Sequence, residues 1–153
     1  MRGRVVLTVV ALSGCIGVLD PVDPAVGPAL AARCTNEDSD PGTDVSYTQD
    51  VLPLLEGESG PVGCGCHFPG SKTPIGIEQA GLDLSSYTSL RAGGVRSRAA
   101  IVVAGRPCDS ILVQKIGEAP PVGARMPFDG PPFLSDAERQ LIADWIAEGA
   151  GEN

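Results

Sequence analysis

The sequence predicts an all-α fold: one small helical domain with long loops rich in glycine and proline. Short apolar segments recur at helical spacing behind residues that cap helices. Glycine and proline, at 20 and 14 of 153 residues, separate these segments. Aromatic residues make up only 4% of the chain, so the core is thin for a domain of this size. We therefore expect a covalent cofactor or disulfides to help hold the fold.

The clearest predicted element is a helix that begins after Ser135. Ser135 and Glu138 have the spacing of a capping box, in which each side chain accepts a hydrogen bond from the other residue's backbone N–H. Gly149 is a suitable end for this helix. Its apolar residues follow at helical spacing and predict one buried face: Leu141, Ile142, Trp145 and Ile146.

Three weaker helices are predicted before it. The first carries the apolar residues of 51–55, the second runs over 85–90, and the third carries the apolar residues of 111–116. Only residues 101–103, Ile-Val-Val, resemble a strand. The connections between these segments are Gly- and Pro-rich loops.

The N-terminus is typical of an export signal. Arg2 and Arg4 precede an apolar stretch at 5–12 that is too short to span a bilayer. Residues 12–15, Leu-Ser-Gly-Cys, resemble the lipobox of bacterial lipoproteins. The resemblance implies that residues 1–14 are removed, that Cys15 is lipidated, and that the protein is anchored in the bacterial cell envelope, facing the periplasm or the cell surface. The alternative is an ordinary secretory signal in which Cys15 has no role.

The residues after the anchor predict a tether and then one domain. Residues 15–45 have no apolar period and are rich in Pro, Gly, Ala and Asp, so we expect a flexible tether there. Cys34 is unusual in a pure linker and suggests that the tether is pinned. Residues 46–150 are expected to fold. The formal charge of −8 argues against nucleic acid as a partner.

The cysteines carry the main chemical signal. Export implies an oxidising compartment, where free thiols are not the default. The run at 63–67 is Gly-Cys-Gly-Cys-His. A C-x-x-C-H run indicates covalent haem attachment, with two thiols on the vinyl groups and the histidine on the iron. Here Cys64, Cys66 and His67 give C-x-C-H, which is one residue shorter.

Two single residues fit the same interpretation. His67 is the only histidine of the chain, and Met126 is the only methionine once the export segment is removed. A haem with histidine and methionine as axial ligands needs one of each, from opposite sides of the ring. Taken singly, His67 is as readily a surface residue and Met126 a residue that fills a gap in the core.

The domain resembles a class I, mono-haem cytochrome c, and the matching segments are residues 47–55, 81–87, 110–116, 125–127 and 134–150. The resemblance implies a helical fold whose first and last helices cross beside the haem. It further implies a thioether from Cys66, His67 as proximal ligand and Met126 as distal ligand. Cys64 is a second attachment candidate, although the family's position for that cysteine falls on Gly63.

The other cysteines remain open. If Cys64 and Cys66 both hold haem, Cys34 and Cys108 are left as a disulfide pair. If only Cys66 does, a Cys64–Cys108 bridge is plausible, and without haem four cysteines allow three connectivities. Arg106 and Arg125 are candidate partners for the haem propionates.

Three functions follow. The first is electron transfer by one covalent haem c, without catalysis, to a redox partner protein in the envelope. The second is a haem-free, disulfide-stapled structural or binding lipoprotein, which the short C-x-C-H motif favours. The third is a metal site for Cu(I) or zinc made from Cys64, Cys66 and His67, with or without Met126.

Overall fold

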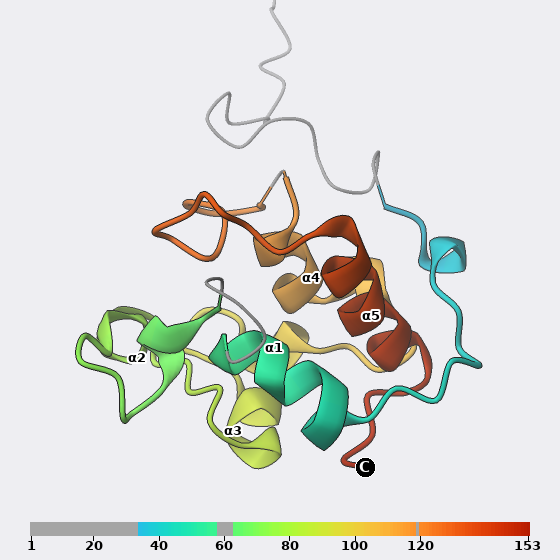
Figure 1. Cartoon of the computed structure of the whole chain (residues 1–153), viewed down its shortest axis with the longest axis horizontal. Helices are drawn as coiled ribbons and strands as arrows, with labels where there is room; N and C mark the ends of the chain where they lie inside the picture. Colours follow the sequence, from blue (N-terminus) through green and yellow to red (C-terminus); the bar gives the residue numbers. More distant parts are fainter. Residues whose placement is uncertain (1–33, 58–62, 119) are drawn as a thin grey trace, which may run out of the picture.

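A computed structural model describes residues 34–57, 63–118 and 120–153 (Figure 1). All regular structure in these ranges is helical, which agrees with the predicted class. The α-helices are α1 (Leu52–Glu56), α2 (Ile75–Ala80), α3 (Tyr87–Ala92), α4 (Ile111–Ile116) and α5 (Asp136–Ala147). Single turns of other helix types are η2 (Asn36–Asp38), η3 (Tyr47–Val51), η4 (Gly65–His67), η5 (Arg98–Ile101) and η6 (Pro107–Asp109).

The four predicted helices are confirmed, as η3 with α1, α3, α4 and α5. The predicted capping box is also present: Ser135 Oγ accepts from the backbone N–H of Glu138 at 3.3 Å, and Glu138 Oε2 accepts from that of Ser135 at 2.7 Å. Helix α2 was not predicted. Its N-cap is Pro74, whose side chain makes no capping hydrogen bond, so the usual start signal is missing from the sequence.

The core is centred on Trp145 of α5, which is fully buried. The ring centroid of Tyr47 in η3 lies 5.5 Å from that of Trp145 and 5.3 Å from that of Tyr87 in α3. The indole Nε1 of Trp145 donates to the carbonyl of Gly151 at 2.9 Å. One aromatic cluster therefore joins η3, α3 and α5, and it compensates for the small number of aromatic residues.

The predicted strand at 101–103 is not formed. Ile101 ends the η5 turn, and the backbone N–H of Val103 donates to Ser110 Oγ at 2.8 Å instead of to a partner strand. Ile101 and Val102 are each only 2% exposed. The apolar run therefore reflects burial, and burial alone does not distinguish a strand from a buried loop.

The folded part begins earlier than predicted. Residues 34–45, assigned to the tether by sequence, lie along α5 in the cyan segment of Figure 1. Cys34 forms a disulfide with Cys108, and the backbone N–H of Asp40 donates to Asp144 Oδ1 at 2.8 Å. The carboxylate of Glu148 accepts from the N–H of Val45, with the closer oxygen at 3.0 Å. We call residues 34–45 the strap.

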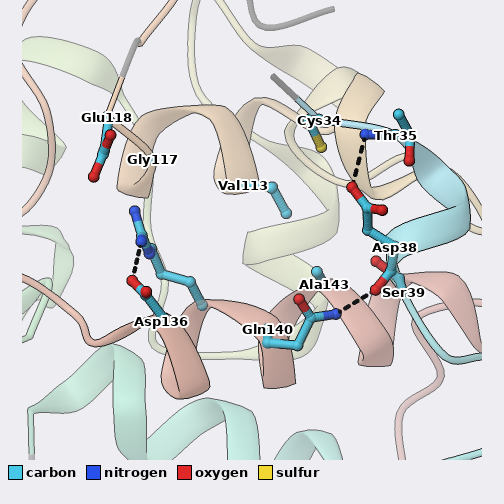
Figure 2. Close-up of a pocket in the computed structure, with 11 residues that line it drawn as sticks. Cys34, Thr35, Asp38, Ser39, Val113, Gly117, Glu118, Asp136, Gln140 and Ala143 are labelled. Atoms are coloured by element: carbon cyan, nitrogen blue, oxygen red, sulfur yellow. Dashed lines mark hydrogen bonds and ion pairs between the residues drawn. The ribbon is translucent and has the colours of Figure 1, made fainter. Parts of the chain in front are cut away.

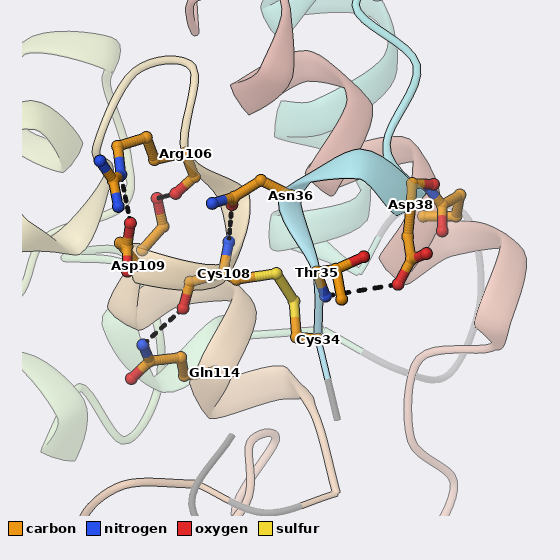
Figure 3. Close-up of a disulfide and its surroundings, with 10 residues drawn as sticks. Cys34, Thr35, Asn36, Asp38, Arg106, Cys108, Asp109 and Gln114 are labelled. Carbon is orange, nitrogen blue, oxygen red and sulfur yellow. Dashed lines mark hydrogen bonds and ion pairs between the residues drawn. A yellow bond between two sulfur atoms is a disulfide. The ribbon is translucent and has the colours of Figure 1, made fainter. Parts of the chain in front are cut away.

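The disulfide is one of several bonds that hold the start of the strap (Figure 3). Asn36 Oδ1 accepts from the backbone N–H of Cys108 at 2.9 Å, and Gln114 Nε2 donates to the carbonyl of Cys108 at 2.7 Å. The C-terminus is held as well, because the carbonyl of Asn153 accepts from Ser46 Oγ at 2.8 Å. The folded part therefore extends beyond residue 150.

The predicted signal peptide, Cys15 and tether residues 15–33 lie outside the described residues. Among the helices that are described, none has the length and apolar character needed to cross a membrane.

Candidate functional site

His67 and Met126 line the same two cavities, although they lie far apart in the sequence. The larger cavity has a volume of about 450 Å³ and the smaller one about 200 Å³. These volumes together are in the range of small-molecule and cofactor sites, roughly 300–1,000 Å³. Six residues line both cavities, which shows that the two adjoin: Cys64, His67, Gln79, Ala80, Met126 and Phe128.

A single tight turn places His67 and the cysteines at this site. The backbone N–H of His67 donates to the carbonyl of Cys64 at 2.8 Å, and that of Phe68 to the carbonyl of Gly65 at 3.1 Å. Residues three apart in a 3₁₀ turn project in the same direction. Cys64 and His67 accordingly line both cavities, whereas Cys66 lines only the smaller one. The C-x-C-H residues therefore lie in, and directly before, a single 3₁₀ turn.

A hydrogen bond through one ring nitrogen holds the imidazole of His67, and the second ring nitrogen takes no part in that bond. Its Nδ1 lies 2.9 Å from the carbonyl of Leu82, and a carbonyl only accepts, so Nδ1 carries the proton. In the neutral imidazole, Nε2 is then the nitrogen with the lone pair that a metal-ligating imidazole requires. Gly76 of α2 packs on the ring: a Cβ at this position would lie 2.7 Å from two ring atoms, so the site has no room for alanine.

Met126 reaches the cavities from the long loop between α4 and α5. This loop, orange in Figure 1, extends on the same side of the molecule as α2. The backbone N–H of Met126 donates to the carbonyl of Lys115 in α4 at 2.8 Å. Lys115 Nζ donates to the carbonyl of Val122 at 2.8 Å and also to that of Ala124. The loop is therefore held by α4.

The cavities are bordered by apolar side chains that are exposed to solvent. In the described part of the chain the exposed large apolar residues are Ile75, Val95, Val122 and Phe128, and every one of them lines a cavity. Val95 is 67% exposed and Phe128 is 74% exposed. Exposed apolar residues concentrated in this way are typical of a binding site, and here they lie in the walls of the two cavities that His67 and Met126 share.

The two thiols at the turn differ in environment. Cys64 is buried and Cys66 is half-buried, and both are unpaired. Burial raises the pKa of the Cys64 thiol to about 12, with smaller contributions from Cys66 and Asp129. A raised pKa keeps Cys64 neutral at ordinary pH, and the thiolate is the nucleophilic form.

This difference gives a prediction for the protein before any cofactor is attached. At pH 8 iodoacetamide should label Cys66 and leave Cys64 unlabelled, and both should react once the protein is unfolded. Peptide mass spectrometry after a timed reaction measures this. Equal labelling of the two residues in the folded protein would contradict the buried position of Cys64.

The basic residues at the site are not those suggested by sequence. Arg106 pairs with Asp109 and Arg125 Nε donates to the carbonyl of Ile116 at 3.0 Å, and neither residue lines the cavities. Among the residues that the structure describes, the basic side chains that line the larger cavity are Arg96 and Lys115, and no acidic side chain lines it. The sequence does not show which basic side chains line the cavity, because that depends on how distant loops fold over it.

A third cavity, of about 390 Å³, lies where the strap meets α4 and α5 (Figure 2). Of the residues singled out by sequence, only Cys34 lines it. Its side chains largely bond to one another or to the strap: Arg139 pairs with Asp136, and Gln140 Nε2 donates to the carbonyl of Asp38 at 3.0 Å. We assign it no ligand.

The metal-site hypothesis gains no support. Within 34–57, 63–118 and 120–153, no group of three or more His, Cys, Asp or Glu side chains is arranged to hold a metal ion. Cys64, Cys66 and His67 therefore do not form such a group.

Comparisons with known proteins give no match for the chain. No family model matches it, and neither a curated protein nor a solved structure does.

Proposed function

We propose that the protein is an electron-transfer protein that holds one haem c between His67 and Met126. The observation that carries the proposal is that the only imidazole of the chain and the thioether of Met126 line one shared pair of cavities. Histidine and methionine are the axial ligand pair of cytochromes c. The haem iron, when bound, supplies one reversible one-electron oxidation, so no substrate is transformed.

The cavity walls fit such a group. The exposed apolar side chains in the cavity walls would pack on a largely apolar ring, and Arg96 could meet its carboxylates. His67 Nε2 would ligate the iron while the carbonyl of Leu82 fixes the ring and raises its basicity. Met126 would supply a second ligand, and a methionine ligand would raise the reduction potential.

The cysteine pairing also favours this function. The disulfide joins Cys34 to Cys108, which leaves Cys64 and Cys66 for thioethers. The haem-free alternative predicts two disulfides among these four residues, and the structure has one of them. Cys64 and Cys66 would hold the group covalently, each through the addition of its thiol S–H across one vinyl double bond, which needs no oxidant or reductant.

The location follows from the N-terminus. In this proposal the lipid on Cys15 anchors the protein in the bacterial envelope, and the acidic domain meets a neutral or basic redox partner.

The proposal is tested on the full-length chain, expressed in bacteria that make c-type cytochromes. The purified protein should show a haem spectrum, and its intact mass after denaturation should increase by one haem. His67→Ala should lose the ligand and most of the attached haem. Colourless protein with an unmodified mass would refute the proposal.

Met126→Leu is the matched variant, because it retains apolar volume and removes only the sulfur ligand. It should retain covalent haem while its potential falls, on the order of 0.1 V within the roughly 0.8 V over which axial ligands act. Redox titration measures the potential. An unchanged potential would show that Met126 does not ligate the iron.

A further inference from the structure

The loop that carries Met126 has little structure of its own. Residues 120–134 contain no helix, and they are rich in glycine and proline. A loop of this kind has many conformations, and placing one side chain in a cavity wall requires contacts from outside the loop. The structure provides these contacts at the end of α4.

Lys115 makes three of these contacts. Its carbonyl accepts from the N–H of Met126 at 2.8 Å, and its ammonium donates to the carbonyls of Val122, at 2.8 Å, and Ala124. Charged donors make the stronger hydrogen bonds. The ammonium therefore binds the loop on the N-terminal side of Met126, and the backbone of the same residue binds Met126 itself.

The position of Lys115 is unusual for a lysine. It lines the larger cavity, it is half-buried, and the described residues contain no carboxylate paired with it. Burial lowers its pKa from the usual value. Desolvating an ammonium group is costly, so a half-buried lysine without an ion pair needs other acceptors for its N–H donors.

We propose that Lys115 is a positioning residue, which holds the loop of residues 122–126 on α4 and thereby places Met126 in the wall of the cavity. The inference rests on the proposed function only for its second consequence, the bond from Met126 to iron. Its first consequence, order in the loop, is independent of haem.

Lys115→Met tests the inference, because it keeps the length of the side chain and removes the donors. The amide of Met126 and those of neighbouring loop residues should exchange with deuterium at least about tenfold faster than in the wild type. Lys115→Arg keeps donors for both carbonyls and should restore slow exchange. Lys72→Met removes one exposed charge outside the cavities and should change nothing.

The haem-loaded protein gives the second measurement. Lys115→Met should weaken or lose the absorption band of the methionine–iron bond and lower the potential, while Lys115→Arg retains both. Wild-type exchange in Lys115→Met, or an intact methionine–iron band in that variant, would overturn the inference. If the wild type carries no haem, the proposed function fails, and the exchange rates alone decide the role of Lys115.

Discussion

Trp145→Ala is expected to lower the free energy of unfolding by about 3–5 kcal/mol, the usual cost of truncating a buried large aromatic side chain. Trp145 has no solvent exposure, and its ring packs on Tyr47. The substitution leaves a cavity where η3 meets α5, and it also leaves the carbonyl of Gly151 without its donor. Urea unfolding followed by circular dichroism measures the change.

Trp145→Phe is the matched control. It retains an aromatic ring beside Tyr47 but lacks the indole N–H, so the expected loss is smaller, about 1–2 kcal/mol. The difference between the two variants separates the packing contribution from the hydrogen bond. If Trp145→Ala unfolds within about 1 kcal/mol of the wild type, the aromatic cluster is not the centre of the core.

Removing the disulfide has the second large expected effect. Cys34 and Cys108 are 74 residues apart, and closing a loop of that length in the unfolded chain corresponds to about 4 kcal/mol in the chain-entropy model. Both residues are changed to serine together, because a single substitution would leave a thiol able to pair with Cys64 or Cys66. Urea unfolding of wild type and double variant, matched for haem content, measures the loss.

Asn36→Ala serves as the control for the strap. It removes the acceptor of the Cys108 N–H but keeps the disulfide, so a loss of only about 1 kcal/mol is expected. If the double serine variant loses no more than Asn36→Ala, the bridge does not contribute to stability in the way the loop length implies.

Much of the site could be predicted from residue types alone. Cys64, Cys66, His67 and Met126 were all candidates, because each carries a chemically distinctive side chain that occurs rarely in this chain. The structure brings these four residues together at adjoining cavities. Three residues of the site were not predicted. Leu82 contributes a backbone carbonyl, Gly76 makes room for the imidazole because it has no side chain, and Lys115 bonds to the loop of residues 122–126. None of these has a pattern in the sequence.

The features of the fold likewise separate into those that the sequence predicts and those that it does not. The sequence by itself determined the helical class, the capped last helix and its buried face, since caps and 3.6-residue spacing are local signals. Only the tertiary structure decided that the strap belongs to the domain, that 101–103 does not form a strand, and that Met126 and His67 line the same cavities. These outcomes depend on contacts between segments distant in the chain, such as Asp40 with Asp144, and no local pattern encodes such a pairing.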